Sequence, residues 1–160
     1  MEELFAGRDI SVPAVLRHLR KVAGELGLPW EDRVKTFNSR RAQELGKWAE
    51  SKENGEEFHA AVFRAYFVEG RNLAKKEVLI DLAGSVGLAE DEADDVLQSR
   101  RFKAAVNEDW RLSREWGITA VPTFLLNGER LVGAQPDGVL EEFLRKHHVP
   151  ERGCAAGSAR

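Results

Sequence analysis

The sequence predicts an α/β protein that is mostly helical and carries one β-hairpin near its C-terminal end. Two observations lead to this prediction. Apolar residues recur at helical spacing over most of the chain as far as Gly117. Beyond that glycine the pattern changes to two short β-type runs joined by Asn127-Gly128, a strong signal for a two-residue hairpin turn. The runs cover residues 123–126 and 130–132.

The first helix is expected from Ser11 to Leu26, because apolar side chains recur on one of its sides. They are Val12, Val15, Leu16, Leu19, Val22, Ala23 and Leu26. Ser11 offers an N-cap oxygen, and Pro13 suits the first turn, where its missing N–H has no intrahelical partner. Gly27 can adopt the left-handed conformation that ends a helix.

The same spacing predicts further helices along the chain. They cover about 39–51, 56–68, 75–86, 90–98, 102–116 and 136–147. The helix 56–68 is apolar over much of its circumference, including Phe63 and Phe67, so we expect it to lie between other helices. The last helix should begin at Pro136 or Asp137 and bury one apolar face. That face holds Val139, Leu140, Phe143 and Leu144. Four tryptophans are expected in core or half-buried packing; they are Trp30, Trp48, Trp110 and Trp116.

Composition excludes several classes of function. A chain of 160 residues can bury a core without disulfides or metals. Charged residues make up 32% of it with a net charge of -3, so neither sign dominates and we expect no nucleic-acid partner. The first residues do not resemble a signal peptide, and no run of about 18 apolar residues occurs. We therefore expect a cytoplasmic protein without membrane contacts.

The cysteine count excludes a redox pair. Cys154 is the only thiol, so one chain can form neither an internal disulfide nor a dithiol site. It lies in a small, polar tail at 150–160, expected to be disordered, with no helix to activate it. We expect no catalytic residue and no metal site, because the histidines lack ligand partners in their neighbourhood. The histidines are His18, His59, His147 and His148.

The segment 117–124 reads Gly-Ile-Thr-Ala-Val-Pro-Thr-Phe and comes directly before the first strand. A proline there suits the start of a strand or a tight turn, and an ordinary loop proline is the alternative. The whole order of long helix, this segment, hairpin, Gly-Ala-Gln-Pro at 133–136 and final helix resembles the C-terminal part of DsbA-like thioredoxin-fold proteins. Within them it is most similar to FrnE-type proteins and their relatives, the 2-hydroxychromene-2-carboxylate isomerases and kappa-class glutathione transferases.

The resemblance covers the chain from Met1 to about His147. Besides the Val-Pro-Thr turn it is carried by three stretches: Phe37-Asn38-Ser39, residues 63–72 (Phe-Arg-Ala-Tyr-Phe-Val-Glu-Gly-Arg-Asn) and Ser99-Arg100-Arg101-Phe102. It implies an incomplete thioredoxin-like fold. Residues 1–98 would be a mainly helical insertion domain, and 99–149 the C-terminal part of the thioredoxin-like domain. The family's strand, Cys-x-x-Cys helix and second strand have no counterpart before Ser11, so its catalysis is not carried over.

The resemblance also implies where a substrate would bind. Pro122 would be cis, and the main chain of Val121 would pair with an extended peptide or thiol substrate, with Thr123 beside it. In the glutathione-using relatives a similar helix start contacts a carboxylate of glutathione. Ala134 and Gln135 are therefore candidates, and glutathione is the one cofactor that the resemblance suggests. A simple helix start is the alternative.

Three functions stay open. The chain could be a truncated DsbA/FrnE-type protein-disulfide oxidoreductase without its own redox site, a non-catalytic peptide-binding or chaperone-like module, or a relative of the glutathione-dependent isomerases and transferases. The coding sequence upstream of Met1 would distinguish the first two.

An isolated hairpin is marginal in water. We therefore expect a dimer or larger assembly through the incomplete sheet, where Phe124, Leu126 and Val132 would be uncovered.

Overall fold

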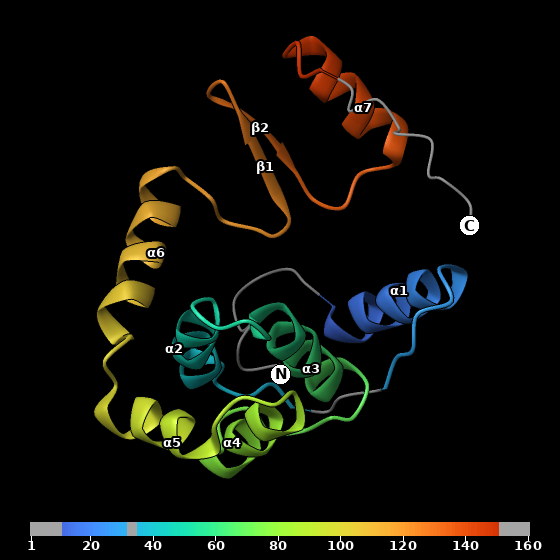
Figure 1. Ribbon diagram of the computed structural model, residues 1–160. Coiled ribbons are helices and arrows are strands. Elements are labelled where there is room, and N and C mark those ends of the chain that lie inside the picture. Colours follow the sequence, from blue (N-terminus) through green and yellow to red (C-terminus); the bar gives the residue numbers. More distant parts are fainter. Residues whose placement is uncertain (1–10, 32–34, 151–160) are drawn as a thin grey trace, which may run out of the picture. The chain divides into compact units, whose positions relative to one another are not determined.

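The computed structural model describes residues 11–31 and 35–150, and it confirms a mostly helical chain with one hairpin in these residues (Figure 1). The elements are α1 (Val12–Glu25), α2 (Arg40–Ala49), α3 (Gly55–Phe67), α4 (Lys76–Ser85), α5 (Glu90–Ser99), α6 (Lys103–Glu115), β1 (Thr123–Leu126), β2 (Glu129–Val132) and α7 (Asp137–Lys146). The chain forms two compact units, one up to Glu108 and one from Asp109. We call them the helical unit and the hairpin unit.

Helix α1 has the caps that its sequence predicts. The hydroxyl of Ser11 accepts a hydrogen bond from the N–H of Ala14 at 3.4 Å. Gly27 has a φ of +66°, a conformation that side chains with a Cβ rarely adopt. The N–H of Leu28 then reaches back to the carbonyl of Ala23 at 2.8 Å, which closes the helix as a Schellman motif does.

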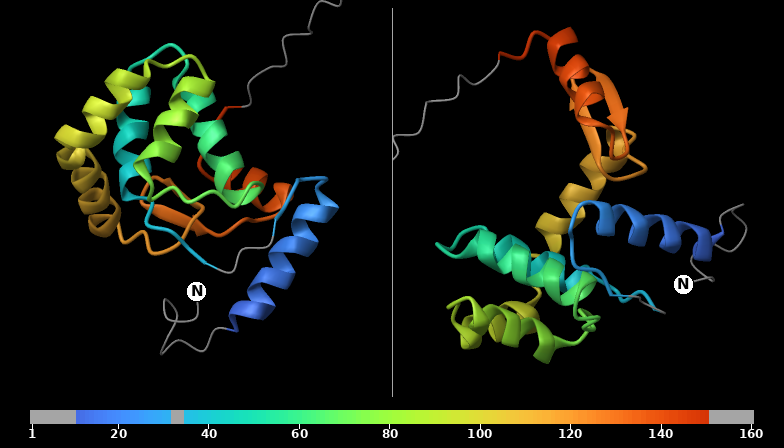
Figure 2. Two further views of the ribbon diagram at one scale, coloured as in Figure 1. Left: turned by 90° about the horizontal axis from the view of Figure 1, so that it is seen from below. Right: turned by 90° about the vertical axis from the view of Figure 1, so that its right-hand side faces the viewer.

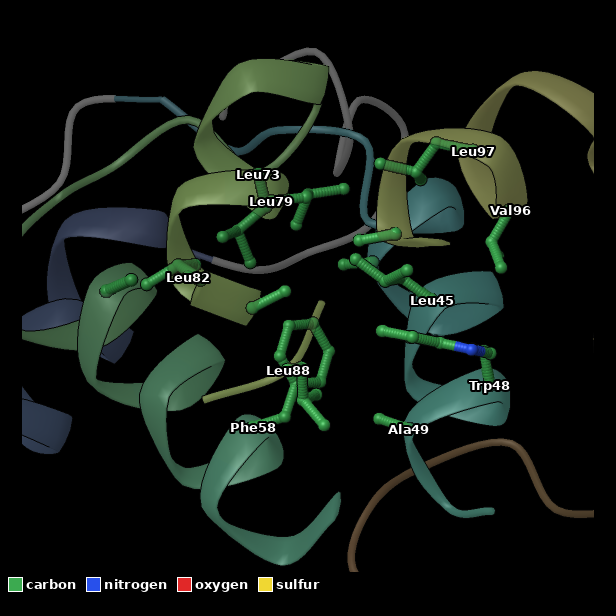
Figure 3. Close-up of a cluster of buried hydrophobic side chains, with 14 residues drawn as sticks. Leu45, Trp48, Ala49, Phe58, Leu73, Leu79, Leu82, Leu88, Val96 and Leu97 are labelled. Carbon is green, nitrogen blue, oxygen red and sulfur yellow. The ribbon is translucent and has the colours of Figure 1, made fainter. Parts of the chain in front are cut away.

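The helical unit holds a continuous apolar core among α2, α3, α4 and α5 (Figure 3). In Figure 3, Leu45, Trp48 and Ala49 of α2 lie opposite Phe58 of α3. The side chains of Leu45 and Phe58 are fully buried. Because these side chains come from several helices, the core fixes the helices to one another.

Helix α3 is enclosed on one side only. Its buried residues contact α2 and α4, but Phe63 is 62% exposed and stacks on Phe67, with ring centroids 5.9 Å apart. The expectation that α3 lies between other helices is therefore wrong for the side of α3 that carries Phe63. Periodicity shows which residues are apolar, but the number of neighbouring helices decides how many of them are covered.

The hairpin unit is built on β1 and β2, which pair antiparallel from Thr123 opposite Val132 to Leu126 opposite Glu129. Asn127 and Gly128 both have positive φ, as a type I′ turn requires, so the predicted turn is confirmed. Helix α7 lies beside the hairpin (Figure 2). Its C-terminal end is tied to β2 by Lys146, whose Nζ lies 2.5 Å from a carboxylate oxygen of Glu129.

Burial in the hairpin unit differs from what the sequence predicts. No residue of α7 is buried, and Val139 and Leu144 on its apolar face are exposed. Leu140 and Phe143 on the same face are half-buried. The prediction is therefore wrong for Val139 and Leu144, because in the described residues the sheet has only two strands to cover the face. Trp110 and Trp116 of this unit are also exposed, whereas Trp48 is buried in the helical unit as expected.

Two further expectations concern the chain ends and membranes. The tail and Cys154 lie outside the described residues, apart from Pro150. Across 11–31 and 35–150, no helix has the length and apolar character needed to cross a bilayer.

Candidate functional site

The turn that joins α6 to β1 begins at a fixed point on the hairpin. Gly117 ends α6 with a φ of +64°. Arg130 of β2 donates from Nη1 to the carbonyl of Trp116 at 2.9 Å and to that of Gly117 at 3.0 Å. A Cβ on residue 117 would lie 2.3 Å from this nitrogen and would displace the arginine, and the positive φ also favours glycine here. Arg130 thereby satisfies carbonyls that the end of α6 would otherwise leave unpaired.

The other end of the turn is tied to the hairpin ladder. The Val121–Pro122 peptide bond is cis. The carbonyl of Pro122 accepts a hydrogen bond from the N–H of Gly133 at 2.8 Å, which extends the β1–β2 pairing by one step. The hydroxyl of Thr123 donates to the carbonyl of Ala120 at 2.7 Å. The residues on both sides of Val121 are therefore held in place.

Val121 itself is left open. It is 88% exposed, the highest value among the large hydrophobic residues that are exposed in the described chain. Its main-chain N–H and C=O have no hydrogen-bond partner among the described residues. A donor and an acceptor on exposed main chain are the groups that a peptide strand can pair with.

The two other predicted site residues lie next to this turn, because Gly133 bonds to Pro122. Ala134 and Gln135 are both exposed, between β2 and the start of α7. The side-chain amide of Gln135 donates to the carbonyl of Val132 at 2.8 Å. This bond holds the chain at the end of β2, and the main-chain groups of Ala134 stay at the surface.

The opposite end of the hairpin carries charged groups that take no part in this turn. The ammonium group of Lys146 donates a hydrogen bond to Glu129 and lowers the pKa of that carboxyl. His147 lies 3.7 Å from the same carboxylate. Glu129 lies opposite Leu126, so the whole of β1 lies between this end and Val121. No three potential metal-binding side chains come together in the parts of the chain that the structure describes.

Sequence reasoning missed one buried charge in the helical unit. Glu44 of α2 has 1% of its side chain exposed. It accepts hydrogen bonds from Arg40 at 2.9 Å and from two nitrogens of Arg100 at 2.5 and 2.8 Å. These bonds lower the pKa of Glu44, and the hydrogen bonds from Arg100 have the largest effect. The spacing of Arg40 and Glu44 on one helix is a local signal for an ion pair, but Arg100 is 56 residues away.

Comparison with known proteins supports the resemblance seen in the sequence. The family described as the DSBA-like thioredoxin domain matches residues 9–145. The structure is similar to that of a probable DsbA oxidoreductase from Streptomyces coelicolor, with 25% identity, 98% of this chain and 70% of that chain covered, and a TM-score of 0.79. It is also similar to the cytosolic disulfide reductase DsbM from Pseudomonas aeruginosa, with 27% identity, coverage of 81% and 75%, and a TM-score of 0.57.

A curated relative matches over a shorter stretch. The uncharacterized protein YwbO from Bacillus subtilis is 30% identical over 98 residues, which cover 61% of this chain. The match spans about half of that protein, 49% of its length. The family match extends over most of the chain and includes the Val-Pro-Thr turn together with both units. The chain therefore belongs to the DSBA-like thioredoxin domain family.

Proposed function

We propose that this chain supplies the substrate-binding side of a DsbA-type protein thiol–disulfide oxidoreductase of the FrnE-type branch. The observation that carries the proposal is the exposed main chain of Val121, held between a hydrogen-bonded Pro122 and the Thr123–Ala120 contact. Family membership and the likeness to the DsbA oxidoreductase from Streptomyces coelicolor support it.

A cysteine-containing peptide in extended conformation would lie along Val121 and exchange main-chain hydrogen bonds with it. Recognition of this kind reads the peptide backbone, so it accepts many side-chain sequences. The hydroxyl of Thr123 is engaged by Ala120, so its role is to hold the turn. The side chain of Val121 points to solvent and leaves the main chain accessible.

The redox step itself needs two thiols. A thiolate attacks a disulfide sulfur to form a mixed disulfide, and a second thiol resolves it and releases the first partner as a thiol. These 160 residues contain one cysteine, so they cannot supply that pair. We propose that the chain has no redox site of its own and that the paired cysteines belong to a unit outside these residues. A chain that binds peptides without any such unit would be the non-catalytic module.

Glutathione and the compartment are further parts of the proposal. The similar reductase DsbM is described as cytosolic, and its structure is also known with GSH, at 28% identity to this chain. This favours a cytoplasmic protein and a glutathione contact at Ala134 and Gln135. Substitution of Ala134 by proline removes the N–H there and should weaken glutathione binding, measured by calorimetry. Unchanged affinity would remove these residues from the site.

Peptide binding tests the proposal without redox chemistry. We would measure fluorescence anisotropy of a labelled extended peptide whose cysteine is S-methylated, against the wild-type chain, Val121→Pro and Val121→Ala. Loss of the N–H in Val121→Pro should weaken binding about three- to tenfold, the usual worth of one hydrogen bond. Val121→Ala keeps the main chain and should bind within about twofold of wild type. Equal binding by Val121→Pro and wild type would contradict the proposal.

A further inference from the structure

A small hollow in the helical unit is lined mainly by arginine side chains. Its volume is about 190 Å³. It is lined by Asn38, Arg40, Arg41, Ala74 and Arg100. These residues come from the start of α2, from the loop before α4 and from the residue that ends α5. Two separate segments, the start of α2 and the end of α5, therefore bring three guanidinium groups to one place, and none of the lining residues that the structure describes carries a carboxylate.

The buried Glu44 does not cancel this charge. Both of its carboxylate oxygens are bonded by Arg40 and Arg100, and the carboxylate lies behind these two side chains with 1% of its surface exposed. Three guanidiniums against one carboxylate leave two positive charges at the hollow. Glu44 instead holds the two arginines in fixed positions, so that a ligand would not have to order them.

A purely structural role accounts for only part of the cluster. Arg40 also donates to the carbonyl of Lys103 at 2.9 Å and to Asn107, so it ties α2 to the start of α6. Arg100 donates hydrogen bonds from two of its nitrogens to Glu44. The side chain of Arg41 has no ion-pair or hydrogen-bond partner within the described residues, although it lines the same hollow.

The side chain of Asn38 adds a neutral donor. Its carbonyl oxygen accepts the N–H of Arg40 at 2.9 Å, which leaves its NH₂ group for another acceptor. Planar guanidinium groups match the oxygen atoms of phosphate and carboxylate groups. The hollow, at about 190 Å³, offers room for one such group.

We propose that this hollow is a binding site for a small anionic molecule, held through a phosphate or carboxylate group by Arg41, Arg100 and the amide of Asn38. The site is built from other residues than the Val121 turn. Anion binding at this hollow therefore goes beyond the proposed function, and its test does not depend on peptide binding at Val121.

The test is a titration of the ¹⁵N-labelled full chain with inorganic phosphate and, separately, with succinate, against sodium chloride at equal ionic strength. We expect saturable shifts of the amide signals of Asn38 and Arg41 with at least one of the two probes. Binding of phosphate alone would identify a phosphate ligand, and binding of succinate alone a carboxylate ligand. No saturable shift beyond that with chloride would overturn the proposal.

Two variants locate the binding. Arg41→Gln removes an unpaired, exposed side chain and should keep the fold, and it should weaken binding about tenfold through loss of one charge-assisted contact. Arg17→Gln on α1 removes one exposed arginine elsewhere and should leave the affinity unchanged. Arg41→Gln with wild-type affinity, or an equal loss in Arg17→Gln, would show non-specific attraction and would contradict the site.

Discussion

The helical unit and the hairpin unit differ in how they bury apolar surface. In the described chain, every fully buried hydrophobic residue lies at or before Val106. In the hairpin unit, Phe124, Val132, Val139 and Leu144 are all exposed although each belongs to a regular element. The helical unit therefore has a core of its own, whereas the hairpin unit has regular secondary structure with an uncovered apolar surface. We propose from this difference that the hairpin unit takes part in a larger sheet.

The largest effect should come from the core of the helical unit. Phe58→Ala removes a fully buried ring and should lower the free energy of unfolding by about 3–5 kcal/mol. Phe124→Ala in the hairpin unit removes a ring that is 39% exposed and should cost about 1 kcal/mol or less. Urea unfolding followed by circular dichroism measures both. Equal losses in the two variants would contradict the difference between the units.

The buried ion pair should give the next largest effect. Glu44→Gln leaves two arginines facing a neutral amide and should lower the free energy of unfolding by about 3 kcal/mol. Glu92→Gln is the control, because Glu92 pairs with Lys52 at the surface, where solvent screens the pair, and it should contribute much less to stability than Glu44. A Glu44→Gln variant as stable as the control in urea would show that the network does not hold the helices together.

The same pair should make the stability of the helical unit depend on pH. Arg100 and Arg40 lower the pKa of Glu44 in the folded state below its ordinary value of 4.5. The unfolded chain therefore binds a proton first as the pH falls. Stability from this group is complete above the ordinary value and is lost between it and the lowered value. Urea midpoints from pH 7 to pH 3 should fall less steeply for Glu44→Gln than for wild type, and parallel curves would refute the coupling.

The hairpin unit should cause self-association. Its two-stranded sheet leaves the edge of β1 unpaired within the described residues, with Leu125 exposed beside it. Sedimentation equilibrium at micromolar concentration should give a mass above that of the monomer, and Leu125→Lys should shift it toward the monomer by placing a charge on that edge. A compact wild-type monomer without a bound partner would contradict this prediction.

The smallest effect concerns the N-cap of α1. Ser11→Ala removes the hydroxyl that accepts the N–H of Ala14 and should destabilise the helix by about 1 kcal/mol. We expect faster amide hydrogen exchange in the first turn of α1, and unchanged exchange around Phe58. Uniform changes throughout the helical unit would show that α1 is part of its cooperative core.

Local signals in the sequence predicted local structure well. Ser11, Gly27 and the Asn127-Gly128 turn act on their immediate neighbours, and the structure has each of them in its expected conformation. Burial was predicted less well, because it depends on neighbours that periodicity does not reveal. Phe63 and Val139 are apolar at the expected spacing, yet they are exposed because none of the described helices and strands covers them.

In the candidate site, too, local features were predicted from the sequence and long-range contacts were not. The residues 121–123 were found through the order of motifs, and the structure places the predicted Ala134 and Gln135 beside them through the bond from Gly133 to Pro122. The contacts from Arg130 to the end of α6 were not predicted, since they join a strand to a helix 13 and 14 residues earlier. The pairing of Glu44 with Arg100 is more distant still and gives no local signal.

Thiol–disulfide turnover tests the central claim, that the chain recognises a substrate but holds no redox pair. The measurement compares the purified wild-type chain with Cys154→Ser in a coupled disulfide-reduction assay. We predict no turnover above the background rate for either chain, because a mixed disulfide formed at a single thiol has no second thiol in the chain to resolve it. Turnover that survives in Cys154→Ser would contradict the claim.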